Sequence, residues 1–171
     1  YGRDMLSRVL MGGQTSIFSA LILVGIIAVG GTLLGLLCGY FGGALDAVIM
    51  RVSDICLAFP GLVFAMAVAA VLQGGIQNAV IALAAVSWPK YARLARSQTL
   101  TVKNLTYIQA AKLSGTSSLG ILFRHILPNI AGPVLVTAML DIGTMMMEIA
   151  ALSFLGLGAQ PPTAEWGSMM S

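Results

Sequence analysis

Charged residues are scarce in this sequence. Asp, Glu, Lys and Arg make up 9% of the 171 residues, whereas soluble domains usually carry about 25%. There is one histidine, so the paired-histidine zinc motif of metalloproteases is excluded, and no Gly-x-Ser-x-Gly or Walker A sequence occurs. We therefore expect no catalytic residues, bound metal or cofactor. Cys38 and Cys56 lie in or beside apolar segments and are expected to be small packing residues. The net charge of +3 comes from too few charges to indicate nucleic-acid binding.

Apolar residues, in contrast, are abundant. They make up 58% of the chain, the mean hydropathy is +0.94, and the apolar runs are long enough to cross about 30 Å of hydrocarbon. These properties predict an all-α, polytopic membrane bundle in a lipid bilayer, with a short pre-helix segment at residues 1–13. The expected transmembrane domain covers residues 14–171, with spans at about 14–41, 45–72, 76–97 and 129–159.

Glycine and proline mark the predicted breaks between and within these spans. Gly42-Gly43 and Gln73-Gly74-Gly75 read as turns. Phe59-Pro60-Gly61 is expected to kink the second span, and Trp88-Pro89-Lys90 to interrupt the third.

Three glycines of the first span, Gly31, Gly35 and Gly39, recur every four residues and so share one helix face. This small-residue spacing permits a second helix to approach closely. The alternative is a membrane helix that is simply rich in glycine. In the second span, Arg51 and Asp54 are three residues apart and can pair on one face.

The distribution of charge predicts an orientation. Six of the nine Lys and Arg residues lie between Lys90 and Arg124, and no acidic residue lies between Asp54 and Asp141. Because basic residues are enriched on the cytoplasmic side, we expect the polar segment 98–127 to be cytoplasmic. The Gly42-Gly43 turn is then cytoplasmic as well, and both chain ends are outside.

Within segment 98–127, a short helix is predicted around residues 105–115. Ile108, Ala111 and Gly115 would share one side of it, and Gly115 suits its C-terminal end. A helix with small residues on one face can enter a partner's groove. The alternative is an ordinary solvated helix.

The same segment resembles the "EAA" loop of permease subunits in binding-protein-dependent ABC importers. The family pattern is Glu-Ala-Ala, three residues, Gly, nine residues, then Ile-x-Leu-Pro. Two positions depart from it: Gln109 replaces the acidic residue and His125 the apolar one. The matching residues are Gln109, Ala110, Ala111, Gly115, Leu127 and Pro128.

Further stretches resemble the peptide and nickel branch of these permeases, and together they cover nearly the whole chain. They are Gly2-Arg3-Asp4 with Ser7-Arg8, Gly39-Tyr40-Phe41-Gly42-Gly43 with Asp46, Arg51-Val52-Ser53-Asp54, Ala58-Phe59-Pro60, Trp88 with Tyr91-Ala92-Arg93, Leu152-Ser153-Phe154-Leu155-Gly156-Leu157-Gly158, Pro161-Pro162-Thr163, and Trp166-Gly167.

The resemblance implies a transport subunit rather than an enzyme, in the cell membrane of a bacterium or archaeon. Its implied partners are a second permease, usually in a heterodimer, two cytoplasmic ATPase subunits that dock on segment 98–127, and an extracytoplasmic substrate-binding protein. It also implies one further membrane helix before residue 1 and one after residue 171. The rival interpretation is a channel or ATP-independent secondary transporter, which needs no docking helix.

Acidic residues inside a membrane span mark a candidate transport path. Asp141 and Glu148 are seven residues apart in the fourth span, with Met145 between them. Carboxylates and thioethers suit a passing metal ion or a cationic peptide terminus. The alternative is a structural role in hydrogen bonding and packing. Residues 140–143 and 162–167 resemble the nickel permeases of this branch more than its dipeptide and oligopeptide permeases. This resemblance favours nickel slightly over short peptides as cargo.

Overall fold

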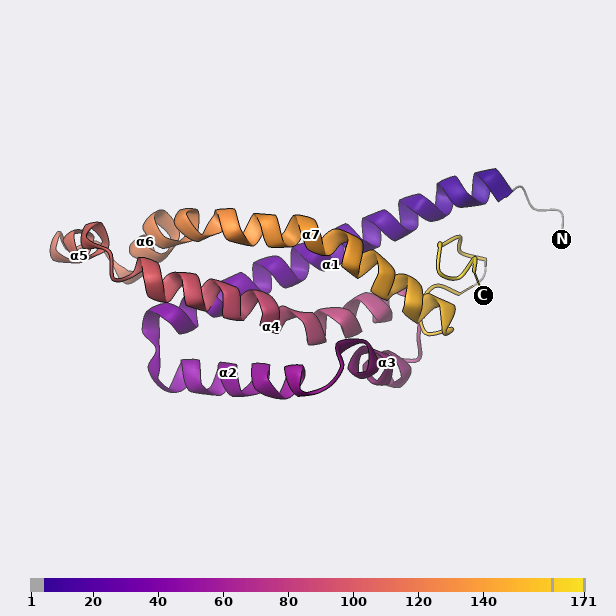
Figure 1. Ribbon diagram of the computed structural model, residues 1–171, viewed down its shortest axis with the longest axis horizontal. Coiled ribbons are helices and arrows are strands. Elements are labelled where there is room, and N and C mark those ends of the chain that lie inside the picture. Colours follow the sequence, from indigo (N-terminus) through magenta and orange to yellow (C-terminus); the bar gives the residue numbers. More distant parts are fainter. Residues whose placement is uncertain (1–4, 161, 171) are drawn as a thin grey trace. The chain divides into compact units, whose positions relative to one another are not determined.

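The computed structural model describes residues 5–160 and 162–170, and every regular element in these ranges is helical (Figure 1). The expected all-α class is confirmed. Two of the family-like stretches, around Gly2–Asp4 and at Pro161, fall wholly or partly outside the described residues. The helices are α1 (Met5–Phe41), α2 (Gly43–Ala58), α3 (Gly61–Val71), α4 (Ile76–Val102), α5 (Thr106–Leu113), α6 (Ser118–Ile121), the π-helix η1 (Leu122–Ile126) and α7 (Leu127–Phe154).

The chain divides into two compact units. The first comprises residues up to 26, 59–87 and from 139 onward, and the second comprises residues 27–58 and 88–138. Helices α1, α4 and α7 are each divided between the units, with one segment in the first unit and one in the second.

In the first unit, the segment after α7 is fixed to α1 through a buried carboxylate. Glu165 is fully buried; it accepts hydrogen bonds from the Ser16 hydroxyl at 3.2 Å and from the Ser168 amide at 2.9 Å. The Trp166 indole donates to the Val9 carbonyl at 2.9 Å. A Cβ at Gly13 would lie 2.9 Å from the Trp166 ring, so the ring requires glycine there. These contacts anchor residues 165–168 against α1.

This anchoring explains why the prediction of a pre-helix segment at residues 1–13 was wrong from Met5 onward. Helix α1 already runs through residues 5–13. No proline occurs there, and the pair Gly12-Gly13, which weakens a helix in isolation, is covered by Trp166.

In the second unit, the glycine face of α1 packs directly on α4. A Cβ at Gly35 would lie 2.1 Å from the Ala92 carbonyl oxygen, and one at Gly39 would lie 2.7 Å from the Thr99 Cβ. Gly31 is equally tight against Tyr91, at 2.6 Å. The prediction of close approach is confirmed, and the partner is α4. At such separations backbone atoms of the two helices are in contact, which only glycine allows.

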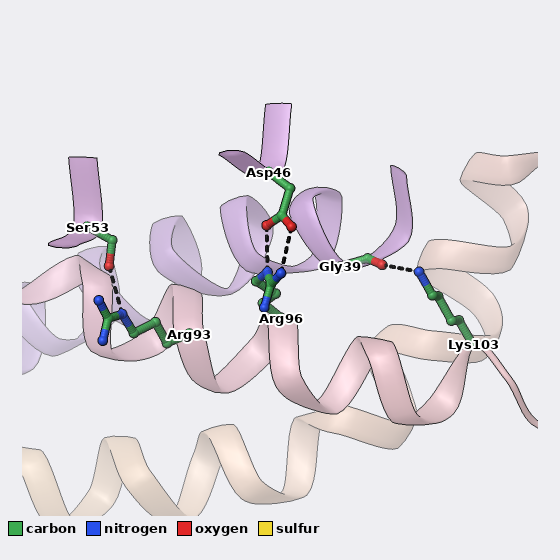
Figure 2. Close-up of polar contacts among 6 residues, drawn as sticks. All are labelled: Gly39, Asp46, Ser53, Arg93, Arg96 and Lys103. Atoms are coloured by element: carbon green, nitrogen blue, oxygen red, sulfur yellow. Dashed lines mark hydrogen bonds and ion pairs between the residues drawn. The ribbon is translucent and has the colours of Figure 1, made fainter. Parts of the chain in front are cut away.

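Charged side chains of α4 also bond to α2, and Lys103, the residue after α4, bonds to the end of α1 (Figure 2). The Arg96 guanidinium donates to both carboxylate oxygens of Asp46, at 2.5 and 2.6 Å. Arg93 donates to the Ser53 hydroxyl at 3.1 Å, and it also pairs with Asp54. The Lys103 amine donates to the Gly39 carbonyl at 2.8 Å.

The predicted turns are confirmed where glycine takes positive φ. Gly42 and Gly43 both have φ +64° between α1 and α2, and Gln73 to Gly75 have φ between +67° and +97° before α4. The second span is broken as expected, since α2 ends at Ala58 and α3 begins after Pro60.

The expected interruption at Trp88-Pro89-Lys90 is wrong, because α4 is helical through Pro89. Trp88 and Tyr91, on either side of the proline, both lie against Gly31, and this packing holds the helix together. Segment 98–127 is likewise not an open loop. It contains the end of α4, then α5, α6 and η1, with short connections at 103–105 and 114–117.

Within the part of the chain that the structure describes, two helical stretches are long and apolar enough to cross a membrane, Met5–Phe41 and Ser118–Phe154. A third is obtained if Gly43–Ala58 and Gly61–Val71 count as one broken span. Helix α4, which carries Lys90, Arg93 and Arg96, is not among them. Its membrane crossing therefore stays a prediction.

Candidate functional site: helix α5 and the acidic face of α7

Helix α5 stands where the short helix was predicted, and it ends as the sequence indicated. Gly115 has φ +78°, a conformation that side-chain-bearing residues rarely adopt. Its amide donates to the Lys112 carbonyl at 3.1 Å, and the Thr116 amide donates to the Ala111 carbonyl at 3.1 Å. This pair of bonds is the Schellman motif, which satisfies the last carbonyls of a helix.

The inner face of α5 packs on its own chain. Ile108 is fully buried, and Ala111 lies partly buried against the same cluster. Because this face is occupied, the prediction that Ile108 and Ala111 present a small-residue face to a partner was wrong about the direction of that face. The buried members of the cluster are Leu36, Ala95, Val102, Ile108, Ile121, Leu122, Ile126 and Ile130.

The outer face of α5 is open to solvent. Gln109 and Ala110 are exposed, as is Gly115 beyond the end of the helix. Leu113 is 90% exposed, the highest fraction among the large apolar residues of the described chain.

Polar contacts at the margins hold α5 in place. The Asn129 amide donates to the Tyr107 hydroxyl at 2.8 Å, which ties the first turn of α5 to α7. The Lys112 ammonium lies 5.2 Å from the centre of the Tyr40 ring, a cation–π contact to α1. Gln109, where the family pattern has an acidic residue, donates to the Asn104 carbonyl at 3.4 Å.

Leu127 and Pro128, the last residues of the predicted docking set, open α7. Leu127 is partly buried against the cluster and Pro128 is exposed. The π-helical turn at Leu122–Ile126 comes just before the proline. Pro128 has no N–H to offer the Arg124 carbonyl, and a widened turn accommodates that missing bond. The hydrophobic pattern did not predict this turn. Pro128 could have indicated it, because a proline leaves a helix carbonyl without its hydrogen bond.

The three candidate path residues lie on one side of α7, and that side faces the chain itself. Asp141 is 3% exposed, Met145 is 6% exposed and Glu148 is half-buried. The opposite side of the same helix is open. Its exposed residues are Met139, Leu140, Gly143 and Met147.

No cluster of three or more His, Cys, Asp or Glu side chains that could hold a metal ion occurs within residues 5–160 and 162–170. The acidic side of α7 thus offers carboxylates with thioethers beside them, but not a ligand cage among the described residues.

The helical architecture and the apolar spans define the class first: the chain is a multi-pass helical protein of the inner membrane. Residues 31–171 match the family described as the binding-protein-dependent transport system inner membrane component, and the chain belongs to that family.

Among its relatives is a probable D,D-dipeptide transport system permease protein of Escherichia coli K12, 50% identical over 99% of this chain and 57% of the relative. Two others are glutathione transport system permease proteins. The one from Pectobacterium atrosepticum is 47% identical, and the one from Escherichia coli O6:K15:H31 is 51% identical; each alignment covers 99% of this chain and 56% of the relative. The chain therefore spans about half the length of the curated relatives it matches.

Proposed function

We propose that the protein is a permease subunit of an ATP-driven importer of short peptides. It pairs with a second permease to form the transport path, receives substrate from an extracytoplasmic binding protein, and couples to two cytoplasmic ATPase subunits. Family membership supports the class of machine. The observation that carries the coupling is the outer face of α5, with Leu113 exposed and the helix fixed from behind by Ile108.

The proposed docking surface consists of Gln109, Ala110, Leu113 and Gly115, with Pro128 at its margin. All five residues are exposed. Ala111 and Leu127 support this surface from the inner side, against the chain's own cluster. Since α5 makes its own inner contacts within the second unit, a partner that binds the outer face acts on a preformed element.

The relatives' names favour short peptides as cargo over nickel. The matched permeases belong to systems for a D,D-dipeptide and for glutathione, both small peptides. The exposed side of α7, with Met139, Leu140 and Met147, is the better candidate for the wall of the path. Asp141 and Met145 are buried and then act in packing within this subunit. This is the alternative to a role in the transport path.

The docking surface is tested by truncating its apolar residue. In the full-length permease assembled with its second permease in lipid nanodiscs, Leu113→Ala is expected to weaken binding of the ATPase subunits at least about ten-fold, as for loss of an interface hot spot. Val71→Ala is the matched control, because Val71 is 83% exposed and lies in the first unit. Equal ATPase affinity for the two variants would remove α5 as the docking element.

A further inference from the structure

Three family-like stretches, two of them close in the sequence and the third about 40 residues further on, meet in the second unit. The first is Gly39–Gly43 with Asp46. The second is Arg51–Asp54, and the third is Trp88 with Tyr91–Arg93. Figure 2 shows three of the contacts at which they meet: Arg93 with Ser53, Arg96 with Asp46, and Lys103 with Gly39. We call this set of contacts the α4 clamp. It consists of Arg93 with Ser53 and Asp54, Arg96 with Asp46, and Lys103 with the Gly39 carbonyl.

The clamp uses one edge of α4. At 100° per residue, Arg93, Arg96 and Lys103 fall within about 80° of each other around the helix. The adjoining edge carries Ala92 and Thr99, which pack on the glycine face of α1. The second half of α4 is therefore held on two sides: backbone contact with α1 fixes its distance, and ion pairs with α2 oppose its sliding and rotation.

The strongest contact is the pair of Asp46 and Arg96. Two parallel hydrogen bonds, at 2.5 and 2.6 Å, fix the orientation of both groups, which a single point contact does not. The side chains are only 18% and 33% exposed, so the pair is partly shielded from water. Asp46 also lies in the first turn of α2, where the helix dipole favours a negative charge.

Lys103 makes the corresponding contact at the end of α1. Its ammonium donates to the Gly39 carbonyl, within the last turn of a 37-residue helix, where the dipole favours a positive charge. The end of α1, the start of α2 and the end of α4 are thus joined at one place by charged hydrogen bonds.

Helix α5 follows the clamp directly. Residues 103–105 alone separate α4 from α5, and Lys103 is itself a clamp residue. Ile108 returns to the cluster that contains Ala95 and Val102 of α4. A force applied to the outer face of α5 therefore reaches α4 through packed contacts, without a flexible linker that would absorb it.

We propose that the α4 clamp transmits the motion of the docked ATPase from α5 to helices α1, α2 and α4, with Asp46, Arg96 and Lys103 as positioning residues. This rests on the proposed function. A broken clamp leaves the docking surface intact, so the ATPase subunits still bind and hydrolyse ATP. Their motion then still reaches α4 and α1 through packed contacts, but α2 no longer moves with them.

The test measures peptide transported per ATP hydrolysed by the full-length permease pair, its ATPase subunits and its binding protein in proteoliposomes. Asp46→Asn and Arg96→Gln are each expected to lower this ratio at least five-fold while ATPase affinity stays within two-fold. The reversed pair, Asp46→Arg with Arg96→Asp, is expected to recover at least half of the lost ratio. Lys103→Met, which keeps the ion pair, is expected to lower the ratio about two-fold. Arg51→Gln, an exposed arginine of α2, is the matched control and should leave the ratio unchanged.

Three outcomes would overturn the proposal. One is an unchanged ratio in the single variants. Another is a parallel loss of ATPase binding, since the clamp would then only keep the docking surface folded. The third outcome applies if the single variants fail to assemble. The proposal is then overturned if the reversed pair restores neither assembly nor coupling and Lys103→Met leaves the ratio unchanged. The proposed function fails separately, and before any substitution, if the unaltered permease binds no ATPase subunits.

Discussion

At the scale of single residues, the glycines of α1 have different structural roles. Gly31, Gly35 and Gly39 face α4 with no room for a Cβ, whereas Gly25 and Gly30 have no atom within 4 Å of the corresponding position. The four-residue spacing identified the first group because one helix face repeats at that interval. The identity of the opposing helix was not predictable, since the residues of α4 that contact these glycines, Tyr91, Ala92 and Thr99, lie 57 to 60 positions further along the chain.

This difference predicts opposite outcomes for two alanine substitutions in one helix. Gly35→Ala places a Cβ 2.1 Å from the Ala92 carbonyl oxygen, so α1 and α4 must separate. We expect a loss of about 1–3 kcal/mol in unfolding free energy, as for an overpacked core. Gly30→Ala adds a methyl group in open space and is expected to change stability by less than about 1 kcal/mol. Denaturant titration in detergent micelles measures both, and equal stabilities would contradict the close packing of α1 on α4.

At the scale of elements, α5 shows what sequence reasoning can and cannot reach. Its position and its end at Gly115 were predictable, because alanine favours helix and glycine permits the positive φ of the terminal motif. Its orientation was predicted wrongly. Ile108 and Ala111 are buried by residues of α1 and of the helices after α5, and such long-range contacts leave no local signature. The exposure of Leu113 follows from the same packing.

The end of α5 yields a prediction that separates backbone strain from side-chain volume. A Cβ at Gly115 meets no atom within 4 Å, so the only penalty for alanine is the φ of +78°. Gly115→Ala is expected to destabilise the end of α5 by about 1 kcal/mol. Gly115→Asn should cost less, because asparagine tolerates this region better. Hydrogen exchange of the amides of residues 112–116 measures the fraying. If asparagine frays the helix as much as alanine, the φ argument is wrong.

Some features of the elements were beyond local pattern. Composition indicated a polar loop at 98–127, but α6 and η1 are helical there because Ile121, Leu122 and Ile126 are buried in the cluster. Pro89 was expected to interrupt α4, yet packing on Gly31 holds the helix. In both cases tertiary contacts override a local preference.

At the scale of the whole molecule, the proposed function makes the chain one part of a larger assembly. Family membership places it among the inner membrane components of binding-protein-dependent transport systems. The scarcity of charge and the long apolar helices are typical of a protein embedded in a lipid bilayer. The proposed energy source is separate, and its effect must enter through contacts such as the outer face of α5. The sequence favoured nickel only slightly as cargo, whereas the relatives are named for the transport of a D,D-dipeptide and of glutathione, so the choice of cargo stays a proposal.

The most direct measurement of the central proposal is substrate uptake into proteoliposomes. They contain the full-length permease, its second permease and its ATPase subunits, with the binding protein supplied on the outer side. We predict uptake of a labelled dipeptide that requires ATP inside and both the ATPase subunits and the binding protein. Nickel offered under the same conditions should not accumulate. Dipeptide uptake that continues without ATP or without the ATPase subunits would contradict the proposal, and ATP-dependent accumulation of nickel in place of peptide would contradict the assigned cargo.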